Sequence, residues 1–198
     1  FWRQTALNEP DLWTNISFDL TKLSREGVET AQCAQLLNSV LERSSGHNLR
    51  VQIKIPGGVL HRELVPWQAL FDALQGTCTR WVSLQIASKV GYHDMSPIFP
   101  RPSKDLDTRR LERLQALSLQ FPFFEGGEDR YQLRNLLKWV ATTAPKLKSI
   151  SHGRIPAAPP EQLVWENVTF LRFSSRRDFT QVASRCANLE TLILDDRS

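Results

Sequence analysis

The stretch Leu114-Gln115-Ala116-Leu117-Ser118-Leu119 decides the fold, because its pattern recurs along the chain. An apolar residue is followed by two residues of any kind, a second apolar residue, one residue of any kind and a third apolar residue. The pattern recurs, complete or with one position missing, at 13–18, 48–53, 81–86, 147–152, 168–173 and 189–194. Apolar residues at alternate positions are typical of a β-strand with one buried face.

The spacing of these stretches indicates an array of repeats. Their central apolar residues are Ile16, Val51, Leu84, Leu117, Ile150, Leu171 and Leu192. Successive centres are 35, 33, 33, 33, 21 and 21 residues apart. Because one repeat cannot cover its own apolar face, repeats of this kind stack on their neighbours.

The segments between the strands carry helical periodicity, with apolar residues three and four positions apart in 27–43, 67–78, 131–142 and 177–187. A strand, a turn and a helix at a fixed period predict an α/β fold, a leucine-rich-repeat-like solenoid of parallel strands with helices on the outer side. We expect strands near 16–19, 51–54, 84–87, 117–120, 150–152, 171–174 and 192–195. A doubly wound domain is the structural alternative, but its strands should be continuously apolar.

Residues 1–13 resemble the last helix and exit of an F-box. In that family a tryptophan and a basic residue precede a helix, which is followed by Pro-x-Leu-Trp; the matching residues are Trp2, Arg3, Pro10, Leu12 and Trp13. The rest of the chain resembles the fungal F-box proteins with degenerate leucine-rich repeats. The matching residues there are Leu41-Glu42-Arg43-Ser44 before a strand and, at a later strand, Arg80, Trp81, Leu84 and Ile86.

The resemblance implies two parts and a function. Residues 1–13 would be the C-terminal remnant of an F-box-like helical cap, and residues 14–198 the solenoid. The chain would be the substrate-recruiting part of an F-box subunit of a cullin–RING ubiquitin ligase. It would reach the Skp-type adaptor and the cullin only through F-box helices upstream of Phe1. The alternative is a protein-interaction scaffold unrelated to ubiquitination, whose first residues only cap the array.

The alternation within each strand predicts where a target protein binds. If the central apolar residues point inward, the next residue of each strand and the residue two places further along point to the concave face, which repeat arrays use for recognition. The candidate partner-binding residues are Ser17, Asp19, Gln52, Lys54, Gln85, Ser118, Gln120, Arg172 and Asp195. A solvated sheet face without a partner is the alternative interpretation.

Catalytic and metal-binding patterns are absent from the sequence. The histidines, at positions 47, 61, 93 and 152, are scattered, and no His-x-x-x-His or Cys-x-x-Cys pair exists. We therefore expect no catalytic residue, no metal and no cofactor; an enzyme with a cryptic α/β site is a remote alternative. His152 stands where the other repeats have an apolar residue; we expect a partly satisfied histidine there, with a ligand role as the alternative. Phe121-Pro122-Phe123-Phe124 is expected to bury itself under a loop, with an exposed docking patch as the alternative.

Charge, apolar stretches and cysteine content indicate which partners and compartment to expect. The 198 residues carry a formal charge of +4, and the basic residues are interrupted by acidic ones, so we expect no nucleic-acid partner. No stretch reaches the ~18 consecutive apolar residues of a membrane span, so no membrane partner is expected. Three widely spaced cysteines (33, 78 and 186) predict buried thiols, and with no visible secretion signal they favour the cytoplasm or nucleus.

Overall fold

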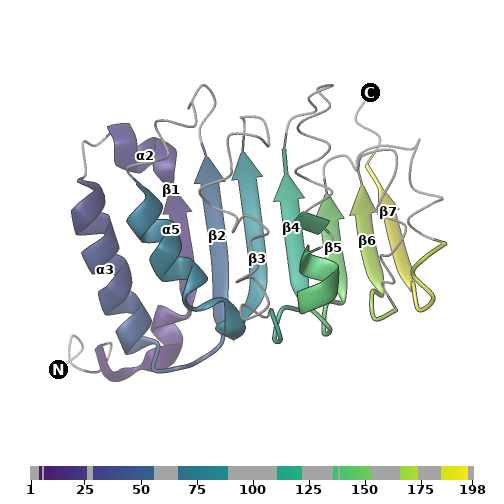
Figure 1. Ribbon diagram of the computed structural model, residues 1–198, viewed down its shortest axis with the longest axis horizontal. Coiled ribbons are helices and arrows are strands. Elements are labelled where there is room, and N and C mark those ends of the chain that lie inside the picture. Colours follow the sequence, from purple (N-terminus) through teal and green to yellow (C-terminus); the bar gives the residue numbers. More distant parts are fainter. Residues whose placement is uncertain are drawn as a thin grey trace.

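One seven-stranded, all-parallel sheet forms the centre of the molecule (Figure 1). The computed structural model describes residues 5, 7–25, 29–55, 67–88, 111–121, 136–137, 139–152, 166–173 and 184–195. The strands are β1 (Asn15–Asp19), β2 (Leu49–Ile55), β3 (Trp81–Ser88), β4 (Ala116–Gln120), β5 (Ser149–His152), β6 (Phe170–Phe173) and β7 (Thr191–Leu194). All seven expected strands are confirmed, with ends within three residues of their expected positions.

The order of the strands in the sheet follows the order of the chain. Each strand pairs in parallel with the next one, from β1 at one edge to β7 at the other. A doubly wound domain reverses its strand order at a switch point. No reversal occurs among these seven strands, so the doubly wound alternative is wrong.

The described helices lie on one face of this sheet. They are α2 (Leu20–Arg25), α3 (Thr30–Arg43) and α5 (Gln68–Gln75), with the 3₁₀ turns η1 (Pro10–Trp13) and η3 (Cys78–Arg80). Figure 1 shows α3 and α5 in front of the sheet, and the helical residues 136–137 and 139–143 in front of β4 and β5. The sheet is therefore covered by helices on one side only, as far as the described residues extend.

The expected helices are confirmed in part. The expectations over 27–43 and 67–78 correspond to α3 and α5, whereas α2, directly after β1, was not predicted. The expectation over 131–142 is met by its described residues, 136–137 and 139–142. The expectation over 177–187 is wrong at its end: residues 184–187 form turns, because the Leu189 amide bonds to the Cys186 carbonyl (3.2 Å) to lead into β7. Residues 177–183 lie outside the described residues.

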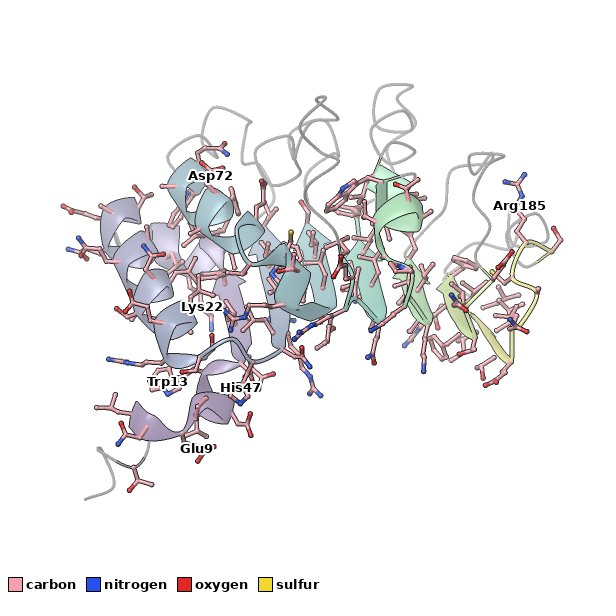
Figure 2. All side chains as sticks on the ribbon, turned by 60° about the horizontal axis from the view of Figure 1, so that its bottom comes forward. Glu9, Trp13, Lys22, His47, Asp72 and Arg185 are labelled. Carbon is pink, nitrogen blue, oxygen red and sulfur yellow. The ribbon has the colours of Figure 1, made fainter. Side chains whose placement is uncertain are left out.

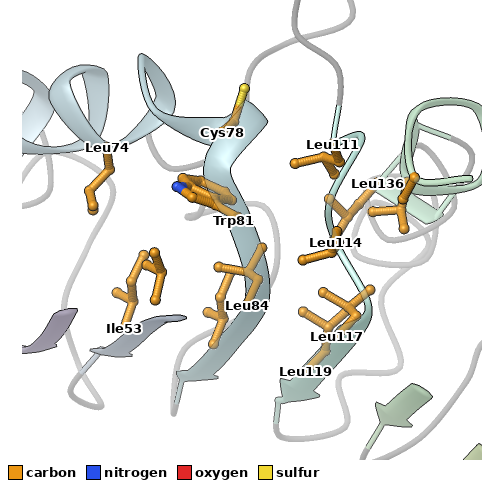
Figure 3. Packing of buried hydrophobic residues seen from close by; sticks show 14 of the residues in the cluster. Ile53, Leu74, Cys78, Trp81, Leu84, Leu111, Leu114, Leu117, Leu119 and Leu136 are labelled. Carbon is orange, nitrogen blue, oxygen red and sulfur yellow. The ribbon is translucent and has the colours of Figure 1, made fainter. Parts of the chain in front are cut away.

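The core lies between the sheet and its helices. The central residues of the seven repeats pair in one continuous row across the sheet, as expected, and six of them are buried: Ile16, Val51, Leu84, Leu117, Ile150 and Leu171. Leu192, in the last strand, is 36% exposed. Figure 3 shows Leu74 of α5 above Ile53, and Leu136 beside Leu114. Burial of apolar surface in this row stabilises the fold by roughly 25 cal/mol for each Å² removed from water.

The second repeat shows how a missing apolar residue is replaced. Asn48 stands where the other repeats place their first apolar residue. The structure buries its neighbour Leu49 completely, and an irregularity between Leu49 and Arg50 brings Leu49 opposite Trp81. The core contact is thus kept by a shift of one residue in the register.

Backbone hydrogen bonds join the turns at the amino ends of the strands. The carbonyls of Gln115, Lys148 and Thr169 each accept two amide hydrogens from the next repeat, at 2.9–3.0 Å. The donors are the amides of Lys148, Ser149, Thr169, Phe170, Glu190 and Thr191. Successive repeats are therefore held in register before their strands begin, independently of side-chain identity.

Arg80 caps the C-terminal end of α3. Its Nε donates to the carbonyl of His47 (3.0 Å), and its Nη2 donates to the hydroxyl and carbonyl of the fully buried Ser44. Carbonyls in the last turn of a helix lack intrahelical partners and favour a cation. Burial, and then the charge of Arg113, lowers the pKa of this guanidinium.

We expect Arg80→Met to lower the free energy of unfolding by about 1.5–3 kcal/mol, the range for hydrogen bonds to a charged group. Methionine keeps much of the apolar stem and removes the donors. Urea denaturation measures the loss, with Arg113→Met as the control, because Arg113 is exposed and bonds only the Asn48 side chain among the contacts described (2.9 Å). Equal losses in both variants would contradict the capping role.

Candidate partner-binding face

The sheet face opposite the helices, here called the open face, carries a continuous row of residues from all seven strands. The residues directly after the buried centres pair with one another across every strand boundary. They are Ser17, Gln52, Gln85, Ser118, Ser151, Arg172 and Ile193, six polar residues and one apolar. The structure thus brings five of the predicted binding residues into this single row.

A second row lies nearer the carboxyl ends of the strands. Asp19, Lys54, Ala87 and Gln120 pair in register across β1 to β4, as their alternation predicts. Strand β7 ends at Leu194, one residue before its expected end, so Asp195 lies directly after the strand. The corresponding positions of the fifth and sixth repeats, 153 and 174, lie outside the described residues.

A third row, near the amino ends, was missed by the sequence reasoning. It consists of Asn15, Arg50, Ser83, Ala116, Ser149, Phe170 and Thr191. Alternation alone could have identified it, because each residue precedes the central apolar residue of its strand. The row adds an exposed cation, Arg50, and a partly buried aromatic ring, Phe170, to the open face.

Side-chain length divides the open face into three zones. Strands β3, β4 and β5 present mainly serine and alanine, with Gln85 and Gln120 the two longer side chains. Strand β2 presents Arg50, Gln52 and Lys54, and β6 presents Phe170 and Arg172. A strip of mostly short side chains is therefore flanked by longer ones, which leaves the backbone of the central strands closest to a partner.

Two polar contacts order the outer strands of the open face. The Ser17 hydroxyl donates to Gln52 Oε1 at 3.1 Å. The Arg172 guanidinium donates both Nε and Nη2 to the carboxylate of Asp195, at 2.8 and 3.2 Å. This hydrogen bonding, and then the charge of Asp195, raises the pKa of Arg172. Two predicted site residues thus form a bidentate pair, whose planar geometry is fixed by the guanidinium fork.

His152 and the three cysteines are buried side chains. His152 is 4% exposed, and burial lowers its pKa to about 3, so the ring is neutral. All three cysteines are buried and outside disulfides, as predicted; burial raises the pKa of Cys33 and brings that of Cys186 to about 11. Within the described ranges no group of three or more histidine, cysteine, aspartate or glutamate side chains is arranged to hold a metal ion.

The aromatic run 121–124 falls partly within the described residues. Phe121 packs against the core, with its ring centroid 6.4 Å from that of His152, as the buried interpretation expects. The other members of the aromatic run, 122–124, and the histidines at 61 and 93 lie outside the described residues.

The predicted F-box remnant is described in part. Pro10, Leu12 and Trp13 belong to η1, which begins with proline, a residue suited to a first helical turn. The guanidinium of Arg43 lies 4.7 Å from the centroid of the Trp13 ring, and Leu12 is 61% exposed. Trp2 lies outside the described residues. Trp13 therefore attaches η1 to the C-terminal end of α3.

No helix within the described part of the chain is both long and apolar enough to span a membrane. Comparisons with protein-family models, with curated proteins and with solved structures find no match to this chain.

Proposed function

We propose that this chain is a leucine-rich-repeat-like solenoid that binds a target protein on its open face. The observation that carries the proposal is the row of six polar residues and Ile193 on the face without described helices. A parallel sheet is usually covered on both faces. Here one face carries serine, glutamine and charged side chains, which can bond to a partner's polar groups without a large apolar patch.

The order of the strands supports the solenoid part of the proposal. Strands that succeed one another at a repeated interval, pair sequentially and keep their helices on one side are what stacked repeats produce. Repeat arrays present extended surfaces, so a target would contact several repeats at once.

The resemblance of residues 1–13 to the end of an F-box extends the proposal. The chain would be the substrate-recruiting part of an F-box subunit of a cullin–RING ubiquitin ligase. Its mechanism would be positional: it would hold a target so that an enzyme on another subunit reaches the target's lysines. It would have no catalytic residue and no cofactor, and it would work in the cytoplasm or nucleus. A scaffold unrelated to ubiquitination would use the same face.

Photo-crosslinking from the open face tests the binding proposal. A photoreactive amino acid at Ser118, in the middle of the open face, should crosslink a target in cells of the source organism. The same group at Gln35, exposed on α3, is the matched control. The identified target is then purified, and Gln85→Arg should weaken its binding by about tenfold or more through lost contact and steric conflict. Equal crosslinking from Gln35, or unchanged binding of Gln85→Arg, would contradict the open face as the site.

Co-purification with the Skp-type adaptor tests the ligase proposal separately. A chain that includes the sequence encoded upstream of Phe1 should retain the adaptor, whereas the chain that begins at Phe1 should not. If neither retains the adaptor, the ligase proposal is wrong and the scaffold alternative stands.

A further inference from the structure

Four side chains that can carry positive charge recur at one position of successive turns. They are His47, Arg80, Arg113 and Lys146, which are equally spaced, one repeat apart, along the chain. Each precedes the first position of the strand pattern, so the in-register pairing of β2 to β5 places them in neighbouring turns at the amino-end edge of the sheet. Neighbouring strands are ~4.8 Å apart, so the four turns span about 14 Å.

Two further cations extend this row, which is here called the basic edge. Its arginine and lysine members are Arg50, Arg80, Arg113, Lys146 and Lys148. In the turns at 44–50, 76–83, 111–116 and 144–149, Glu112 is the one carboxylate. Figure 2 is turned so that this edge comes forward, with His47 labelled on it. Acidic residues separate these cations along the chain, whereas the pairing of the strands brings them together at one edge of the sheet.

Contacts between the turns bring the guanidinium groups together. Arg80 bonds the carbonyl of His47, and Arg113 reaches across to Asn48 Oδ1 at 2.9 Å. Both arginines are therefore directed toward the same turn, and the charge of Arg113 acts on the guanidinium of Arg80. Two like charges held close together favour an anionic group that binds both, and guanidinium groups bind carboxylates in bidentate geometry.

We propose that the basic edge binds an acidic polypeptide segment, at a surface that adjoins the open face at Arg50 and otherwise lies in the turns before the strands. Four turns match the length of about four to five extended residues, at ~3.4 Å each. Single-stranded nucleic acid is the less suitable polyanion, because its binding relies on aromatic platforms for the bases. Trp81, the one tryptophan, tyrosine or phenylalanine in these four turns, is only 5% exposed.

A labelled peptide of eight alternating aspartate and glutamate residues tests this proposal, by fluorescence anisotropy with the complete chain. We expect binding that weakens as salt rises, and a loss of about tenfold or more in Arg113→Glu/Lys146→Glu. Arg80 is left intact because it caps α3. The control is Lys22→Glu/Gln32→Glu/Gln35→Glu, which makes the same total charge change at exposed positions of α2 and α3, and should bind within about twofold of the wild type.

Three results would overturn the proposal. The first is no binding of the peptide by the wild-type chain at low salt. The second is an equal loss in the control, which would indicate general electrostatic attraction to the chain and not a site at the basic edge. The third is tighter binding of an eight-nucleotide single-stranded RNA that depends on the same edge. If charge reversal prevents folding, as checked by urea denaturation, Lys146→Gln/Lys148→Gln replaces it and should weaken peptide binding by about threefold or more.

Discussion

Leu84→Ala is expected to lower the free energy of unfolding by about 3–5 kcal/mol, the upper part of the range for a leucine removed from a packed core. Leu84 is 2% exposed and pairs between Val51 and Leu117 in the central row. Because β3 lies inside the sheet, with strands on both sides, little relaxation can fill the cavity. Urea denaturation, monitored by circular dichroism, measures the change.

The neighbouring residue provides a control in the same strand. Gln85→Ala removes a side chain from the open face and should change the free energy of unfolding by no more than about 0.5 kcal/mol. The pair therefore tests the register of β3, because a shift of one residue exchanges the two faces. A larger loss from Gln85→Ala than from Leu84→Ala would show that the assignment of faces is inverted.

Acid should destabilise the wild-type protein through His152 by about 2 kcal/mol between pH 7 and pH 5. The pKa of this histidine is about 3 in the folded chain, because burial disfavours the charged ring, against about 6.5 when unfolded. Between these values the unfolded chain holds a proton that the folded chain does not. The free energy of unfolding therefore falls as pH drops below 6.5, by about 1.4 kcal/mol per pH unit, until pH 3.

His152→Leu should remove this component. Leucine suits the position, since Leu119 and Phe173 are its paired neighbours in adjacent strands. The measurement is the difference between the wild-type and variant free energies of unfolding at pH 7, 6 and 5, which cancels the carboxylates common to both. Ser151→Ala, on the opposite face of β5, retains His152, so the difference between its free energy of unfolding and that of the wild type should be the same at all three pH values. A pH-independent difference for His152→Leu would contradict a neutral buried ring.

The sheet could be predicted from the sequence because its information is local. Alternation of apolar residues sets which face is buried, and the two repeat intervals, one long and one short, set which residues become neighbours. The row from Ser17 to Ile193 is a consequence of those two observations, and the structure places every member where they indicate. The role of these residues in binding is still a prediction, because periodicity identifies a face and not its partner.

Other features depend on distances in space that spacing along the chain does not reveal. The pairing of Arg172 with Asp195 requires two side chains 23 residues apart to meet on adjacent repeats. The basic edge went unrecognised because acidic residues separate its cations in the sequence. Helix α2 was missed because six residues are too few for a clear helical period. The expected helix near 177–187 fails at its end because the turn into β7 uses those residues.

The backbone ladder at the amino ends of the strands has a consequence for how freely this sequence can vary. Any residue with an amide hydrogen can donate to those carbonyls, so nineteen of the twenty amino acids satisfy the ladder and only proline cannot. Conservation of individual residues is thus not required for neighbouring turns to bond. A designer could rewrite the exposed positions of each turn, or change the length of the segment that returns to it, and keep the repeats aligned. The alignment of the repeats therefore depends on backbone amides and on the apolar pattern of the strands, and not on the identities of the turn residues.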